Sequence, residues 1–393
     1  MLILTPAAWA EKWTLQYFFD QDGKEFHISD LAFPSASRGI AVGVVTDNEG
    51  EKGQFTALVT SDAGAHWSNV PLKEFPRSLF FLNDSVGWMV TNQGLWFTEE
   101  SGRSWIRLAD QIKPNKKLEA APAGGLLQRV FFLDAKHGYA VGGQKTVLES
   151  RDGGRSWTPL AEAAKPSANP AFSFYTAIAF DRGDNGQSNR RGIIAGGYVP
   201  PKRGAFSDVP DWMQPDLALA KRTVPLMAFE LDTRDGGGTW ASSTAPVFGT
   251  ITQIGLAGRL GLAVLSYEDA FPWPSDAQRI DLKTGKSDSV FRRVDRRVTS
   301  SLLFADGQAF LAAVEPAGRL RSVPIPGKVR ILRTSNLAEA RVVPETNAAT
   351  FVDDWTETPV DYRAVANTVI LAGPDAEHLW AATDTGMILR LTR

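Results

Sequence analysis

The stretch ESRDGGRSW, from Glu149 to Trp157, places an acid, two glycines, a hydroxyl residue and a tryptophan within nine residues. Similar stretches occur at three other places, namely TSDAGAHW from Thr60, TEESGRSW from Thr98 and TRDGGGTW from Thr233. Each has Ser or Thr first, an acid third, Gly fifth and Trp eighth, and His66 replaces a second hydroxyl residue in the first copy. Four copies indicate a repeat architecture, whereas an enzyme needs one active site.

Each position of this motif, which we call a box, has a role in a tight turn. The acid can accept hydrogen bonds from backbone N–H groups of its own turn. The glycine supplies a backbone conformation that a side chain would oppose, and the tryptophan opens the next strand with a large apolar surface. The motif therefore predicts twelve structural residues: Asp62, Gly64, Trp67, Glu100, Gly102, Trp105, Asp152, Gly154, Trp157, Asp235, Gly237 and Trp240.

The sequence around the boxes repeats as well. RSLFFLNDSVGWMVTNQGLWFTEESGRSWIRL, from Arg77, and QRVFFLDAKHGYAVGGQKTVLESRDGGRSWTPL, from Gln128, each contain four short apolar runs separated by turns. Four strands in roughly 40–50 residues are typical of a β-propeller blade. Seven such units can be placed, the fifth and sixth without a box, with first strands near Ile28, Ser78, Arg129, Tyr175, Ile251, Val298 and Arg363.

The two ends of the chain complete each other. The seventh unit stops after three strands, and the N-terminus begins with an isolated strand, KWTLQYFF, opened by Trp13. We expect Trp13 to Phe19 to complete the last blade, because this closes the ring and removes an open sheet edge. The prediction is an all-β, seven-bladed β-propeller of four-stranded antiparallel blades spanning 11–393 as one domain, with six or eight blades as alternatives.

Composition limits the possible functions. The chain is 43% hydrophobic and 22% charged, with a formal net charge of −2, which argues against a nucleic-acid partner. It has no cysteine, so disulfides and thiolate metal sites are excluded. Of the four histidines, His66 lies in a box, and His137 and His378 occupy matching turns. We therefore expect no metal or other cofactor, and no segment approaches the length of a membrane span.

The N-terminus, MLILTPAAWAEKW, has an apolar run that ends in Ala8-Trp9-Ala10. A small residue on either side of a larger one after an apolar run resembles the end of a secretory signal. The prediction is that residues 1–10 are the remnant of an export signal and that the protein is periplasmic or otherwise exported. The alternative is an apolar terminus without a targeting role.

Long insertions are expected on one face of the ring. In a blade, connections between strands two and three, and from strand four to the next blade, emerge on the face opposite the boxes. The insertions assigned to that face are 47–53, 110–126, 200–222, 266–277, 315–327 and 344–362. Loops on rigid scaffolds commonly carry function, and interfaces favour Trp and Arg. The predicted partner contacts are Trp212, Trp273, Trp355, Arg292, Arg293, Arg296 and Arg297, although each Trp could instead only pin its own loop.

The boxes, with units such as FFLDAKHGYAVGGQKTVLESRDGGRSW, resemble the photosystem II stability/assembly-factor family of Asp-box propellers and its bacterial relatives. The similarity covers the ring and is best in units two and three. It implies exported, non-enzymatic, seven-bladed propellers that bind membrane-protein assembly intermediates, with an arginine-rich surface implicated in binding. The predicted function is a non-catalytic, exported, monomeric scaffold or assembly factor that binds a protein of a membrane or periplasmic complex.

The alternative is a glycoside hydrolase or a carbohydrate-binding propeller, because sialidases carry the same boxes. Sialidases also need an early Arg-Ile-Pro motif, which this chain lacks; VPIPGKVRI, from Val323, is late and has no arginine before its Ile-Pro. Other glycosidases need two carboxylates roughly 5–10 Å apart. The candidates are Asp353, Asp354 and Glu357, paired with Asp211 or Asp269.

Overall fold

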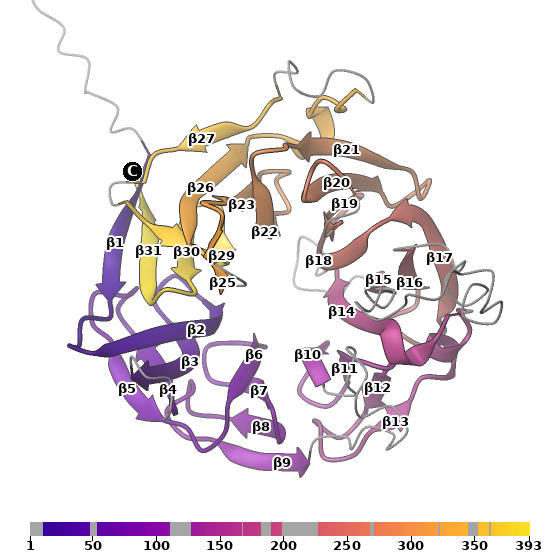
Figure 1. The fold of residues 1–393 in the computed structure, drawn as a ribbon. Helices are drawn as coiled ribbons and strands as arrows, with labels where there is room; N and C mark the ends of the chain where they lie inside the picture. Colours follow the sequence, from indigo (N-terminus) through magenta and orange to yellow (C-terminus); the bar gives the residue numbers. More distant parts are fainter. Residues whose placement is uncertain are drawn as a thin grey trace, which may run out of the picture.

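The computed structural model is a ring of seven four-stranded antiparallel blades around a common axis (Figure 1). It describes residues 11–47, 53–110, 127–166, 168–181, 190–198, 227–267, 271–320, 323–344, 353–360 and 363–393. The fold class and the blade count predicted from the boxes are confirmed. Trp212, Asp211, Asp269 and residues 1–10 lie outside the described residues.

Consecutive strands form the blades, numbered one to seven along the chain. Blade one consists of β2 Lys24–Ala32, β3 Gly39–Asp47, β4 Gly53–Thr60 and β5 Ser68–Pro71. Blade two consists of β6 Pro76–Phe81, β7 Gly87–Thr91, β8 Gly94–Thr98 and β9 Ile106–Asp110. Blade three consists of β10 Leu127–Phe132, β11 Gly138–Gly142, β12 Val147–Ser150 and β13 Thr158–Pro159. Blades four and five consist of β14 Ser173–Phe180, β15 Gly192–Tyr198, β16 Met227–Thr233 and β17 Ala241–Phe248; and β18 Thr250–Ala257, β19 Leu260–Ser266, β20 Ser275–Asp281 and β21 Ser287–Arg292.

Blade six carries additional short strands. It contains β22 Arg297–Leu303, β23 Ala309–Glu315, β26 Gly327–Thr334 and β27 Thr356–Thr358, with β28 Val365–Ala366 also paired to β26 and a separate hairpin of β24 Arg319–Leu320 and β25 Val323–Pro324. Blade seven contains β29 Val369–Asp375, β30 His378–Thr383, β31 Met387–Thr392 and β1 Lys12–Phe18. The short 3₁₀ helices are η2 Ala161–Ala164, η3 Pro170–Phe172 and η5 Leu337–Glu339.

The N-terminal strand closes the ring, as predicted. β1 pairs antiparallel with β31, from Lys12 opposite Thr392 to Phe18 opposite Met387, and Figure 1 shows the two strands side by side. Trp13 is fully buried, and its backbone N–H donates to Pro359 O at 2.8 Å. The sequence placed the first strand of blade seven too early, near Arg363. Residues 365–366 instead pair with the start of β26, and the inner strand β29 begins at Val369.

A repeated aromatic contact joins neighbouring blades. The second strand of one blade begins with a large apolar residue that packs on a Phe at the end of the next blade's first strand. Trp88 of blade two stacks on Phe132 of blade three, with ring centroids 3.7 Å apart and planes 7° apart. Gly138 leaves room for that ring, because a Cβ there would lie 2.4 Å from Phe132. Equivalent stacked pairs are Trp380 with Phe33 and Tyr139 with Phe180.

The boxes form the turns between the third and fourth strands of blades one to four, as the motif predicts. Their four key glycines have φ between 80° and 92°, a region that opposes a side chain. In the third box, Asp152 Oδ1 accepts the backbone N–H groups of Arg155 at 3.0 Å and Ser156 at 2.9 Å. Asp62 and Asp235 bind their own turns in the same way, through the N–H groups of His66 and Thr239. The box is therefore a turn-forming device.

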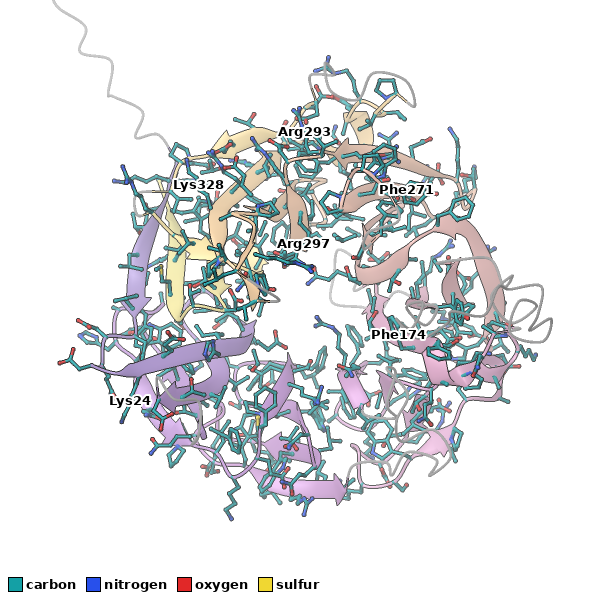
Figure 2. All side chains as sticks on the ribbon, viewed as in Figure 1. Lys24, Phe174, Phe271, Arg293, Arg297 and Lys328 are labelled. Carbon is teal, nitrogen blue, oxygen red and sulfur yellow. The ribbon has the colours of Figure 1, made fainter. Side chains whose placement is uncertain are left out.

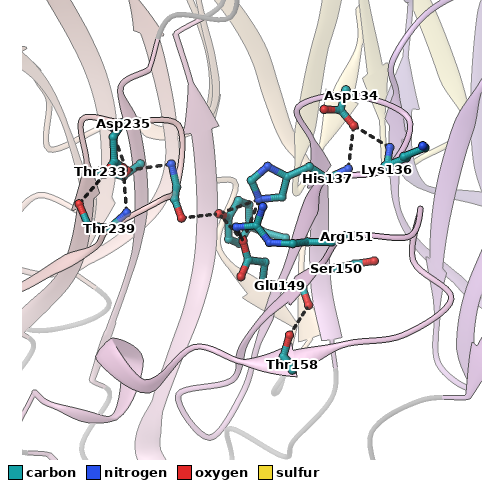
Figure 3. Close-up of polar contacts among 12 residues, drawn as sticks. Asp134, Lys136, His137, Glu149, Ser150, Arg151, Thr158, Thr233, Asp235 and Thr239 are labelled. Carbon is teal, nitrogen blue, oxygen red and sulfur yellow. Dashed lines mark hydrogen bonds and ion pairs between the residues drawn. The ribbon is translucent and has the colours of Figure 1, made fainter.

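Three of the four boxes also accept a hydrogen bond from an aromatic side chain of the preceding blade. The indole N–H of Trp88 donates to Gly153 O of the third box at 3.0 Å, and that of Trp380 donates to Ala63 O of the first at 3.1 Å. Tyr139 OH donates to Gly237 O of the fourth box at 3.2 Å and also contacts Glu149. Glu149 in turn contacts His137 and Arg151, as Figure 3 shows. The box thus connects two blades as well as two strands.

The lowered pKa values of the box carboxylates predict that the fold loses stability in acid. Hydrogen bonds from the Ser156 hydroxyl and N–H lower the pKa of Asp152 from 3.8 to about 2, and turn N–H bonds do the same for Asp62 and Asp235. A depressed folded-state pKa stabilises the fold above the unfolded value, and this contribution is lost as pH falls through the folded value. We expect the melting temperature to fall between pH of about 4 and about 2 more steeply for the native chain than for a D62N/D152N/D235N variant. Equal pH dependence in thermal melts would contradict this assignment.

One insertion follows a different course from the one expected. The sequence assigned 344–362 to the connection between blades six and seven, but β27 at 356–358 is the fourth strand of blade six. The insertion is therefore a connection between strands three and four, and it leaves the ring on the box face. Val343, in the described first part of this connection, contacts blade five, where its N–H donates to Ser289 O of the outer strand β21 at 2.8 Å. It thereby covers part of an open sheet edge.

Candidate functional site on the loop face of blades five and six

The face opposite the boxes, called the loop face, carries most of the insertions at the predicted connections. Those in blades five and six join β19 to β20 and β23 to β26, and the second contains the β24–β25 hairpin. The connection from β21 to β22 carries the arginine run Arg292–Arg297. The β15–β16 insertion, with Trp212, lies outside the described residues.

Exposed apolar side chains gather around blade six. Leu320 and Val323 of the β24–β25 hairpin are 71% and 65% exposed. Large apolar side chains are exposed at nine described positions, and five of these belong to loop-face segments around this blade: Val294, Leu320, Val323, Ile325 and Val365. Exposed patches on an otherwise ordinary surface commonly mark interaction sites.

A cavity of about 550 Å³ lies beside this hairpin, where blades five, six and seven meet. Arg297 and Asn367 line it from the starts of two neighbouring inner strands, while Arg319, Pro316 and Ile325 line it from the β23–β26 connection. Arg297 is exposed, its Nη2 donates to Asn367 O at 2.6 Å, and Figure 2 shows it reaching toward the centre of the ring. A guanidinium is therefore presented among apolar groups.

Arg292 has a different environment from Arg297. Its Nη2 lies 2.7 Å from Oδ2 of Asp276, a fully buried carboxylate that also accepts the hydroxyls of Tyr267 at 3.1 Å and Ser289 at 2.6 Å. The Arg292 guanidinium carbon stacks 4.7 Å from the Trp273 ring centroid. Arg292 thus stabilises the interior of blade five through its ion pair with Asp276, and its guanidinium packs on Trp273 and holds it in place.

Arg293 and Arg296 are also held by carboxylates. Arg293 Nη2 lies 3.0 Å from Asp353 Oδ2, and Figure 2 places Arg293 at the outer edge of the ring. Arg296 lies 3.4 Å from Glu357 and 3.6 Å from Glu315. The four predicted arginines therefore do not form one free surface, and only Arg297 lines the cavity.

The two described tryptophans differ in the surface that they offer. Trp273 lies in the β19–β20 connection, is half-buried, and stacks on Phe271 with centroids 5.6 Å apart. Trp355 is 7% exposed, and its indole N–H donates to Val290 O of blade five at 3.0 Å. It precedes β27 as Trp67 precedes β5, so it occupies the place of a box tryptophan in blade six. Burial leaves Trp355 almost no surface for a partner.

The candidate glycosidase carboxylates that the structure describes are in ion pairs. Asp354 binds the Arg341 guanidinium through two nitrogens, at 2.7 and 2.9 Å, and this hydrogen bonding lowers the pKa of Asp354. Asp353 binds Arg293, and Glu357 binds Arg330 and Arg296. None of the three lines the cavity beside the hairpin. A glycosidase acid needs a raised pKa, the opposite of the shift at Asp354.

The described residues provide neither a cluster of metal ligands nor a membrane-spanning helix. Among the residues that the structure describes, no three His, Asp or Glu side chains come together as a metal site. No helix in the described ranges is both long and apolar enough to cross a lipid bilayer.

Known structures share the architecture of this chain. A structure of YCF48 bound to a D1 peptide has a TM-score of 0.53 at 14% identity, over 96% of this chain and 97% of that one. YCF48 from Cyanidioschyzon merolae gives 0.54 at 13% identity, over 97% and 98%. A GH74 enzyme from Niastella koreensis gives 0.40 at 12%, over 92% and 70%, a score too low to carry an argument. No family model and no curated protein matches the sequence. These identities establish the fold alone, which is a β-propeller like that of YCF48.

Proposed function

We propose that this propeller is a non-catalytic scaffold that binds another protein through the loop face of blades five and six. The observation that carries the proposal is the cavity lined by Arg297 and Arg319 beside a hairpin with exposed Leu320 and Val323. Apolar groups with a few arginines are characteristic of interface centres. Trp273, held by Arg292, lies in the neighbouring connection and is proposed as a further contact.

The structural neighbours support this use of the fold. One of the YCF48 structures is bound to a D1 peptide, so a propeller of this shape accommodates a peptide. Catalysis is not part of the proposal, because the described carboxylates of the glycosidase alternative are occupied by arginines. The partner is proposed to be a membrane or exported protein, on the sequence evidence of the apolar segment that ends in Ala8-Trp9-Ala10.

The proposal predicts that hairpin substitutions abolish partner binding without unfolding the ring. A photo-reactive amino acid at position 320 should cross-link one specific protein, and the same group at Ile106, which is exposed at a box-face turn, should not. Once that protein is identified, the L320E/V323E variant should bind it at least about tenfold more weakly. The reason is that burying each apolar side chain contributes about 1.5–3 kcal/mol. The matched control I106E should bind normally.

Two results would contradict the proposal. Equal cross-linking from positions 320 and 106 would remove the distinction between the two faces. Normal binding by a folded L320E/V323E variant would show that the hairpin is not a contact. The glycosidase alternative would instead be supported by turnover of a glycoside panel that is lost in D353N or D354N.

A further inference from the structure

A short strand separates two hollows on the loop face of blade six. The inner hollow is the 550 Å³ cavity, to which Asn367 contributes. The outer hollow has a volume of about 380 Å³ and is lined by Lys328, Arg363 and Ala364 together with the ion-paired Arg330 and Glu357. The two residues between Ala364 and Asn367 are β28, which pairs with the start of β26. A ligand that crosses β28 would therefore reach both hollows.

Both hollows carry positive charge that the described structure leaves unneutralised. Arg297 and Arg319 line the inner hollow, and Lys328 and Arg363 line the outer one. All four residues are exposed, and none forms an ion pair with another described residue. Four unpaired cations on one blade favour an anionic ligand.

The nearby acids do not neutralise these cations, because they bind other arginines. Glu315 and Glu357 both bind Arg330, at 2.9 Å for Glu315, and both also lie within reach of Arg296. Asp295 lies 3.6 Å from Arg296. The described acidic side chains of this surface are thus occupied by other arginines, and none of them pairs with the four cations.

The ridge between the hollows is apolar. Val365 of β28 is 39% exposed, and Ile325 at the edge of the inner hollow is 42% exposed. Asn367, whose carbonyl accepts a hydrogen bond from Arg297, lies four residues after Arg363. Four residues of extended chain span about 13 Å. An occupant that satisfies both ends needs negative groups about this far apart and apolar groups between them.

We infer that the occupant is an extended, acidic segment of the partner protein, with carboxylates about four residues apart and apolar side chains between them. This inference rests on the proposed function and adds the chemistry of the bound segment. The inner carboxylate meets Arg297 and Arg319, the apolar residues contact Val365 and Ile325, and the outer carboxylate meets Lys328 and Arg363. Concave ends that each take one side chain suit a peptide better than the flat surface of an anionic membrane.

Fluorescence anisotropy with synthetic peptides tests the inference. The spaced peptide is Asp-Asp-Val-Thr-Val-Asp-Asp, and the clustered peptide, Val-Val-Thr-Asp-Asp-Asp-Asp, has the same composition. The spaced peptide should bind more tightly, and a version with Lys in place of Asp should not bind. Binding of the spaced peptide should weaken with added salt, because exposed charges are screened.

Charge variants test the two ends separately. R297Q/R319Q and K328Q/R363Q should each weaken binding of the spaced peptide by about threefold to tenfold, since each variant loses two exposed ion pairs with the peptide carboxylates. The matched control R103Q/K283Q removes two exposed box-face cations and should leave binding unchanged. Equal affinity for the spaced and clustered peptides, or no effect of either loop-face variant, would overturn the inference.

The outcomes separate this inference from the proposed function. If L320E/V323E loses the cross-linked partner while the peptides fail to distinguish the charge variants, the scaffold function stands and the acidic segment does not. If neither partner binding nor peptide binding depends on the loop face, both the proposed function and this inference are wrong. Sedimentation with phosphatidylglycerol-containing vesicles that depends on the same four cations, without peptide binding, would assign this surface to an anionic membrane and overturn the inference.

Discussion

Deleting residues 1–20 is expected to destabilise the whole ring, because these residues include the fourth strand of blade seven. β1 pairs with β31 along its length, and Glu11 binds both Arg333 of blade six and the C-terminal residue Arg393. Without β1, the edge of β31 is open and the core between blades six and seven loses the fully buried Trp13. Open edges also promote association between chains. The truncated protein should melt at a clearly lower temperature and aggregate on heating.

Single substitutions in β1 separate closure from a general effect of truncation. Trp13→Ala should lower the free energy of unfolding by about 3–5 kcal/mol, as expected for removal of a buried tryptophan. Phe18→Ala is the matched control, because Phe18 lies in the same strand but is 45% exposed, and its effect should stay within about 0.5 kcal/mol. Denaturant unfolding measures both changes. A truncated chain with the native melting temperature would show that β1 does not close the ring.

The architecture could be predicted from the sequence because each box residue is required by the local backbone geometry of its own turn. The required φ of Gly154 and the turn bonds of Asp152 depend on nearby residues, so a single repeat reveals them. The predicted match between the turns of His137 and His378 holds in detail, because Asp134 and Asp375 occupy equivalent positions in them. Each aspartate accepts the N–H of the histidine three residues later, at 2.8 and 2.9 Å. Local patterns of this kind are visible in one chain without any knowledge of its tertiary contacts.

The same approach misplaced parts of blades six and seven, where long insertions interrupt the local pattern. Trp355 occupies the place of a box tryptophan, but the insertion that separates it from β26 hides that correspondence in the sequence. The short β28 pairs with β26, so its apolar residues resemble the start of the next inner strand. Strand pairing between distant segments decides both assignments, and spacing along the chain cannot reveal it.

The arginines of the candidate site show a second limit. Arg292, Arg293, Arg296 and Arg297 lie within six residues, yet the first three bind carboxylates from three other positions along the chain, Asp276, Asp353 and Glu357. The sequence indicated the composition of the surface but not which charges neutralise one another. Arg363 and Lys328, which line the outer hollow, carried no signal of their own, because neither belongs to a motif or a charge run.

The second large effect is expected at Trp88, which joins blades two and three. Trp88 is fully buried, its ring stacks on Phe132, and its indole N–H binds Gly153 O of the third box. Trp88→Ala should remove the stacking and the hydrogen bond and lower the free energy of unfolding by about 3–5 kcal/mol. Because each blade of a repeat protein contacts only its neighbours, the loss falls on a single interface between blades.

Trp88→Phe is the matched control, because it keeps an aromatic ring on Phe132 and removes the indole donor. Its cost should be smaller, with about 0.5–1.5 kcal/mol from the lost hydrogen bond. A double-mutant cycle of Trp88→Ala and Phe132→Ala should show a coupling of about 0.5–1.5 kcal/mol from the ring contact itself. If Trp88→Ala were as stable as Trp88→Phe in denaturant unfolding, the stacked pair would not hold these blades together. The equivalent pairs Trp380–Phe33 and Tyr139–Phe180 would then lose the same role, since they share this geometry.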